Sequence, residues 1–81
     1  METRVAVISI IVENTEAVEK LNALLHKSGQ FIIGRMGIPY REKGISIISV
    51  ALDAPTDAIN ALTGALGRIP GVVAKAAYSR T

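Results

Sequence analysis

Two short segments of this chain are apolar on both alternating sets of side chains. Residues Arg4–Val12 read RVAVISIIV, and residues Ile45–Leu52 read ISIISVAL. Both are rich in β-branched residues and contain neither glycine nor proline, which predicts β-strands. Successive side chains of a strand point to opposite faces, so a strand that is apolar on both sets is expected to be covered on both faces. We therefore predict that these two strands lie at the centre of a sheet.

The first predicted helix, Thr15–Ser28, follows the first strand directly. Asn14 precedes it and is a favourable N-cap, because its side-chain oxygen can accept from a free backbone N–H of the first turn. Apolar residues recur at helical spacing, as Leu21 and Leu25 show. Gly29 is placed to end the helix in a left-handed conformation.

The second predicted helix, Pro55–Arg68, follows the second central strand. Pro55 fits the first helical position because its missing N–H would have no partner there. Gly64 and Gly67 weaken the interior of this helix, and we expect a close approach of the helix to the sheet to explain them. The two remaining strands are predicted over Gln30–Gly37 and Val72–Ser79.

The order of the predicted elements is βαββαβ, and each half of the chain is a strand, a helix and a strand. This pattern predicts the ferredoxin-like α+β fold. Right-handed crossovers then give a four-stranded antiparallel sheet in the order 4-1-3-2, with both helices on one face. We expect the 81 residues to form a single domain, residues 1–81. The predicted core includes Val7 or Ile8, Leu21, Leu25, Ile48, Leu62 and Leu66.

The apolar content is high for a chain of this length. Hydrophobic residues make up 49% of the sequence and charged residues only 20%. Two helices can cover only one side of a four-stranded sheet, so apolar side chains remain on the other side. We therefore predict a homo-oligomer, a dimer or a tetramer. Small residues that would let two sheets approach closely are Ser9, Ser46 or Ser49, Ala51, Ala74 and Ala76.

The composition offers little material for catalysis or for metal binding. The chain has no cysteine, which excludes disulfides, thiolate metal sites and cysteine catalysis. His26 is the only histidine, whereas a metal site needs three or four suitable ligands. No serine lies in an arrangement with His26 and an acid that would indicate a catalytic triad. We expect no catalytic residue, no metal, no cofactor and no enzymatic activity.

The charge pattern argues against binding to nucleic acids or to membranes. The net charge is only +2, and the basic residues are scattered along a chain with three aromatic residues. Nucleic-acid binding would need clustered basic residues with aromatic partners, so we expect none by the chain alone. No apolar run reaches the length of about 18 residues that could span a membrane. The first residues lack the basic flank and cleavage site of a signal peptide, which favours a cytoplasmic location.

The most unusual segment is Gly34–Arg41, which holds two glycines, two arginines, a proline and a tyrosine. One interpretation is a loop that presents backbone N–H groups and guanidinium groups to an anion. The other is a strand end with a bulge and a turn, for which Pro39 would suit the sheet edge. The phosphate cradle of acylphosphatases has a similar spelling. It follows the first strand, however, whereas this segment follows the second, so we reject that assignment.

Several further stretches, together with Gly34–Arg41, give the chain a specific family resemblance. They are Gly44–Ile47, Asp57–Gly64 and Leu66–Val72. From Arg4 to Ser79 the chain resembles the iron-only hydrogenase system regulator family. The resemblance implies a small ferredoxin-like protein, related in architecture to ACT regulatory domains and to the C-terminal domain of the nickel-responsive repressor. It also implies a regulatory role.

The resemblance indicates where a ligand would bind. ACT domains bind amino acids near the connection between the first strand and the first helix, often at a dimer interface. The matching residues here are Glu13, Asn14 and Thr15, without the glycine common in ACT loops. Arg35, Tyr40 and Arg41 could reach that site from a neighbouring subunit. Two departures limit the analogy with the nickel repressor. The chain lacks the histidines and cysteine of that effector site, and the first strand occupies the place of a DNA-binding segment.

Two functions remain open at this point. The first is a stand-alone ACT-like regulatory module that senses a small-molecule effector at a subunit interface. The second is an oligomeric adaptor without a small ligand, which acts on a hydrogenase-maturation or regulatory protein. A polar hollow near Asn14, Arg35 or Tyr40 would favour the first, and an exposed apolar patch would favour the second.

Overall fold

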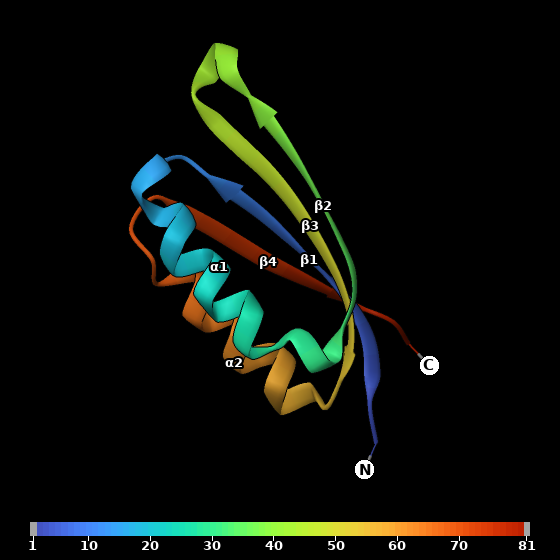
Figure 1. Cartoon of the computed structure of the whole chain (residues 1–81). Coiled ribbons are helices and arrows are strands. Elements are labelled where there is room, and N and C mark those ends of the chain that lie inside the picture. The colour runs from blue at the N-terminus through green and yellow to red at the C-terminus, as the bar shows by residue number, and fades with distance from the viewer. Residues whose placement is uncertain (1, 81) are drawn as a thin grey trace.

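Four antiparallel strands form one sheet, and two helices pack on one of its faces (Figure 1). The computed structural model describes residues 2–80. The strand order is β2-β3-β1-β4, which is the predicted order read from the opposite edge. The strands are β1 (Arg4–Val12), β2 (Ile32–Tyr40), β3 (Ile45–Ala54) and β4 (Val72–Tyr78). The helices are α1 (Val18–Lys27) and α2 (Thr56–Gly67), with short 3-10 turns η1 (Thr15–Ala17), η2 (Gly29–Phe31) and η3 (Arg41–Lys43).

The core lies between the sheet and the two helices. On β1 every second side chain is buried: Ile8 is 0% exposed, whereas its neighbour Val7 is 38% exposed. The sequence left open which set faces the helices, and the structure assigns this role to the set that contains Ile8. The other predicted core residues are all buried, namely Leu21, Leu25, Ile48, Leu62 and Leu66. Neither helix of the described chain is long and apolar enough to cross a membrane.

The connection from α1 to β2 differs from the prediction. Gly29 does not adopt a left-handed conformation. The chain instead passes from α1 into the 3-10 turn η2, in which the Phe31 N–H donates to the Ser28 carbonyl at 2.9 Å. This turn packs Phe31 against the core. As a result β2 begins at Ile32, and the prediction of a strand from Gln30 was wrong.

The strand β2 also runs further than predicted, to Tyr40 instead of Gly37. Pro39 lies within it and is paired with Ser46. The strand tolerates this proline because β2 is an edge strand, where a missing N–H can face away from the sheet. A bulge interrupts the pairing between Ile32 and Gly34. The segment Gly34–Arg41, for which an anion-binding loop was one interpretation, is therefore mostly part of an edge strand.

Two expectations about small residues were wrong. A Cβ atom at Gly67 would meet nothing within 4 Å, and one at Gly64 would meet only the Arg68 guanidinium, at 3.4 Å. These glycines therefore do not mark a close approach of α2 to the sheet.

The alanines of β4 that were expected at an interface between sheets lie on the other face. Ala74 and Ala76 pack against the core on the helix side, not on the opposite face. Pro55 precedes α2 as its N-cap and is not its first residue.

Candidate functional site

The turn after β1 and the turn before β4 are held together by backbone contacts. The Glu13 N–H donates to the Gly71 carbonyl at 2.7 Å. Gly71 has φ of +84°, and a Cβ atom there would lie 2.6 Å from the Cβ of Asn14. Only glycine satisfies both the conformation and the space. The start of η1 is therefore held against the turn between α2 and β4.

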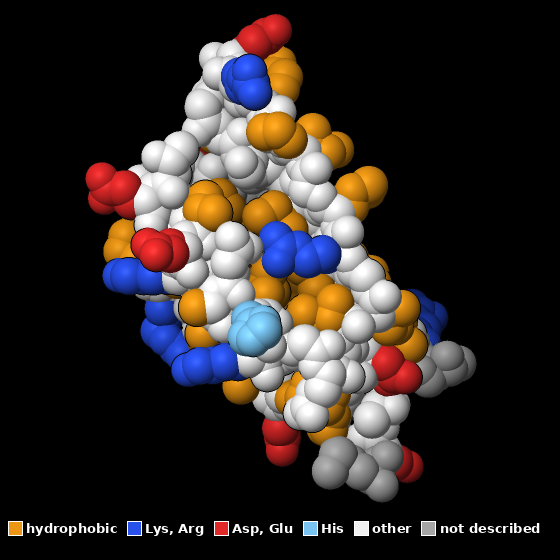
Figure 2. Space-filling view, viewed as in Figure 1, with side chains coloured by type: hydrophobic (Ala, Val, Ile, Leu, Met, Phe, Trp, Pro, Cys, Tyr) orange, Lys and Arg blue, Asp and Glu red, His pale blue; other side chains and the backbone are white. Residues whose placement is uncertain are grey.

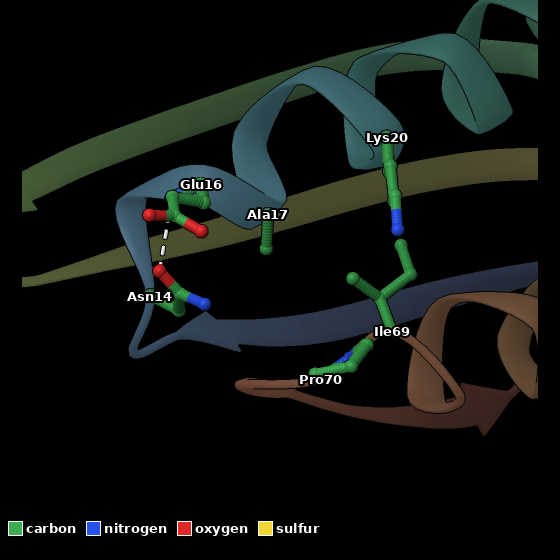
Figure 3. A pocket seen from close by; sticks show the side chains of 6 residues that line it. All are labelled: Asn14, Glu16, Ala17, Lys20, Ile69 and Pro70. Atoms are coloured by element: carbon green, nitrogen blue, oxygen red, sulfur yellow. Dashed lines mark hydrogen bonds between the residues drawn. The ribbon is translucent and has the colours of Figure 1, made fainter.

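Asn14 caps the 3-10 turn η1, as the sequence predicted. Its Oδ1 atom accepts a hydrogen bond from the Glu16 N–H at 3.0 Å, and its carbonyl accepts from the Ala17 N–H at 2.9 Å. The amide nitrogen of the same side chain lies on the opposite side from Glu16 (Figure 3). One end of the amide thus holds the turn, and the other end is a hydrogen-bond donor on the far side of the side chain.

A hollow of about 230 Å³ lies beside this turn, and we call it the turn hollow. Its apolar part comes from three side chains on η1 and on the connection to β4, and its polar part from three side chains at the start of the helical layer (Figure 3). The lining residues are Asn14, Glu16, Ala17, Lys20, Ile69 and Pro70. A carboxylate, an ammonium group and an amide therefore surround an apolar floor.

A second hollow, of about 160 Å³, lies where η1 meets the tip of the β2–β3 hairpin, and we call it the tip hollow. The Tyr40 hydroxyl donates to the Glu42 carboxylate at 3.3 Å, which orients this ring at the tip. Most of the lining is apolar side chain and backbone. The lining residues are Thr15, Pro39, Tyr40, Arg41, Gly44, Ile45 and Ser46.

The five predicted ligand-binding residues are divided between these places. Thr15, Tyr40 and Arg41 meet in the tip hollow, whereas Asn14 lines the turn hollow. Arg35 lies in neither, and its guanidinium donates to the Asn22 side chain of α1 at 3.2 Å. Asn14 and Thr15 are adjacent in sequence, but each lines a different hollow on either side of η1.

Sequence analysis missed Glu16 and Lys20 as site residues. Both are exposed, and their spacing of four residues places them on one side of the helical segment that begins at η1. That spacing next to the predicted cap Asn14 was the available signal. The contribution of Ile69 and Pro70 had no such signal, because it depends on the contact between two turns that are distant in the chain.

The remaining features offer no metal centre within residues 2–80. No group of three or more His, Cys, Asp or Glu side chains there is placed to hold an ion. A third hollow, of about 330 Å³, lies near the chain ends and includes Arg4 and Arg80. The Arg4 guanidinium is already engaged, since it donates to the Ser79 carbonyl at 2.5 Å and lies 5.0 Å from the centre of the Tyr78 ring.

This architecture defines a ferredoxin-like α+β protein. A sequence model of one family matches residues 4–76, and its description is "TM1266-like: Iron-only hydrogenase system regulator, putative". Because the match covers most of its length, the chain belongs to the TM1266-like family. No match was found among curated proteins.

The solved structure of one relative agrees with this assignment, and a second structure shares the fold. The uncharacterized protein TM1266 from Thermotoga maritima is 36% identical, with a TM-score of 0.93, and the match covers 98% of this chain and all of that one. A PII-like nitrogen regulatory protein from Thiomonas intermedia K12, solved with ADP, AMP and bicarbonate, is 15% identical. That match has a TM-score of 0.51 and covers 98% of this chain and 99% of the other.

A more distant match shows that the same fold occurs inside a larger protein. It is a formyltetrahydrofolate deformylase from Pseudomonas putida KT2440, 11% identical, with a TM-score of 0.65. The match covers 90% of this chain but only 28% of the deformylase. At this identity the likeness shows the fold alone.

Proposed function

We propose that this protein is a stand-alone ACT-like regulatory module of an iron-only hydrogenase system, which senses a small molecule and catalyses no reaction. The family assignment supports the regulatory role. The observation that carries ligand sensing is the turn hollow, where Asn14, Glu16 and Lys20 surround an apolar floor. In this proposal residues 1–81 act as one domain, and the protein works in the cytoplasm.

The chemistry of the turn hollow favours a small zwitterion such as a free amino acid. The Lys20 ammonium matches a carboxylate, the Glu16 carboxylate matches an ammonium group, and the Asn14 amide can donate a further hydrogen bond. The volume of about 230 Å³ suits a ligand of that size. The amino-acid sites that the family resemblance implies lie at the same connection.

A subunit interface would complete such a site, because both hollows are open on the isolated chain. Thr15, Tyr40 and Arg41 already meet in the tip hollow. Arg35, held by Asn22 in this structure, would have to leave that partner in order to take part.

A screen of thermal stability against amino acids, nucleotides and metal ions tests this function. A ligand at 100 times its Kd should stabilise the fold by about 2.7 kcal/mol. For a chain of this length, that corresponds to an increase in Tm of more than about 10 °C. We expect the increase with one or a few amino acids, and we expect Lys20→Ala to abolish it.

The matched control is Lys27→Ala, which removes the same charge from the last turn of α1, away from the hollow. This variant should keep the full ligand-induced increase. If no compound changes the Tm of the native chain, or if both lysine variants lose the response equally, the turn hollow is not the sensor.

A second candidate function is an oligomeric adaptor that binds another regulatory or hydrogenase-maturation protein without a small ligand. The observation in its favour is the set of exposed apolar side chains on the sheet, among them Met36 and Ile38. The ligand screen separates the two functions, since an adaptor gives no thermal response to any small molecule. Neither function includes DNA binding by the chain alone.

A further inference from the structure

The face of the sheet that the helices leave uncovered, which we call the outer face, is apolar across its whole width. One row of paired residues crosses all four strands from edge to edge. Every member of this row is a large aliphatic residue between 40% and 51% exposed. The row consists of Ile38, Ile47, Ile11 and Val73.

The neighbouring rows continue this surface with small or aliphatic side chains. Ser9 and Ser49 face each other at the centre of the sheet, and Val7 pairs with both Ala51 and Ala77. Small central residues with larger ones around them let a second sheet approach closely. Two charged side chains lie on this face: Lys75 pairs with Ser9 on the edge strand β4, and Asp53 lies near one end of β3.

The β2–β3 hairpin gives this face a second reason to be covered. It projects beyond the end of the helical layer, as Figure 1 shows, and apolar side chains stand out along its margin in Figure 2. The pair Tyr40–Ile45 lies beyond the last residue of β1 that pairs with β3. A two-stranded ribbon has little stability of its own in water. The exposed Tyr40 at the end of this ribbon would therefore gain stability from a partner outside the chain.

We propose that a second copy of this chain packs on the outer face, sheet against sheet, and forms a homodimer. The aliphatic side chains exposed there leave on the order of 600 Å² per subunit in water, and the small residues between them add to it. A stable interface buries about 800 Å² per partner. The outer face is self-complementary in chemistry, because aliphatic rows flank two small serines at its centre and the charged side chains lie on the edge strand β4 and near the end of β3. This interface lies on the face of the sheet opposite the turn hollow and does not depend on ligand binding.

The experiment compares two glutamate substitutions of matched exposure on opposite sides of the molecule. Ile47→Glu places a charge at the centre of the outer face, where the side chain is 43% exposed. Val18→Glu places the same charge on α1, where the side chain is 37% exposed. Sedimentation velocity and light scattering, at protein concentrations on the order of 10–100 µM, give the mass of each species.

We expect a dimer for the native chain and for Val18→Glu. For Ile47→Glu we expect a monomer, with at least a hundredfold weaker association and an unchanged far-UV circular dichroism spectrum. A monomeric native chain at 100 µM overturns the proposal and leaves the face to a different protein. Dissociation by Val18→Glu with retention by Ile47→Glu overturns it in favour of a helix-side interface.

A second variant, Ile11→Glu, shows whether the result for Ile47→Glu comes from a local folding defect. Ile11 lies beside Ile47 in the same row, on the neighbouring strand. Both variants should become monomeric. The thermal response to ligands, measured on the same samples, tests the other proposal separately. A dimer without any ligand response supports this interface and contradicts ligand sensing, and a ligand-responsive monomer does the reverse.

Discussion

At the scale of single residues, three glycines differ in two properties: whether the backbone has a positive φ, and whether a Cβ atom would have space. Gly71 has a positive φ, and a Cβ there would clash with Asn14. Gly44 also has a positive φ, of +65°, but has open space around it. Gly29 has neither constraint. The three positions therefore isolate the backbone contribution from the steric one.

Substitution of these glycines by alanine should give a graded loss of stability. Gly71→Ala should lower the free energy of unfolding by about 2 kcal/mol or more, because left-handed conformation costs about 1–2 kcal/mol and the clash adds to it. Gly44→Ala should cost about 1 kcal/mol, whereas Gly29→Ala should cost nothing and can add up to about 1 kcal/mol, because alanine fits there and restricts the unfolded chain. Urea denaturation followed by circular dichroism measures all three. Equal effects at Gly71 and Gly44 would show that the contact with Asn14 carries no strain.

At the scale of elements, strand assignment succeeded where both sets of side chains were apolar. The segments around Ile8 and Ile48 could be assigned as central strands because a short β-branched segment that is apolar on both sets of side chains is typical of a strand covered on both faces. Which set faces the helices was not accessible, since both sets satisfy the same apolar pattern. Gly29 was misassigned because a glycine after a helix favours the left-handed conformation but does not require it, and here Phe31 prolonged the turn.

The candidate site was less accessible from the sequence than the fold. Asn14 was identified because its role as a cap is local, and the structure confirms that role. Its separation from Thr15 into a different hollow depends on the direction of η1, which is set by the contact with Gly71. Arg35 could not be placed because a bulge near the start of β2 determines its face. Long-range contacts thus decided what local patterns could not.

The helix α2 should become more stable when its last glycine is replaced. Gly67 is helical, and a Cβ there would occupy open space. Gly67→Ala should therefore raise the free energy of unfolding by about 0.5–1 kcal/mol, which is an increase of about 2–8 °C in Tm. The reverse change at an exposed position of the same helix, Ala61→Gly, should lower it by a similar amount. A decrease with Gly67→Ala in calorimetry would mean that the glycine serves a contact outside the isolated chain.

At the scale of the whole molecule, the fold divides its surface between two tasks. The helix side and its connections carry the polar groups of the turn hollow, whereas the outer face of the sheet is apolar. The β2–β3 hairpin belongs to both, because Tyr40 lines the tip hollow and Ile38 lies on the outer face. If two copies pack through their outer faces, the hairpin connects the subunit interface to the ligand region. Dimer formation and ligand binding should then be coupled, each changing the other's affinity by the same factor.

The dependence of thermal stability on protein concentration provides the last prediction. A folded dimer that dissociates on unfolding is stabilised by mass action, by about 1.4 kcal/mol for every tenfold increase in concentration. For two chains of 81 residues this corresponds to an increase in Tm of about 3–6 °C per tenfold. The native chain and Val18→Glu should show this slope in scanning calorimetry between low and high micromolar concentration. Ile47→Glu should show none, because its folded state is a monomer. A flat Tm for the native chain would mean that the outer face stays in water and that the fold is stable without a second copy.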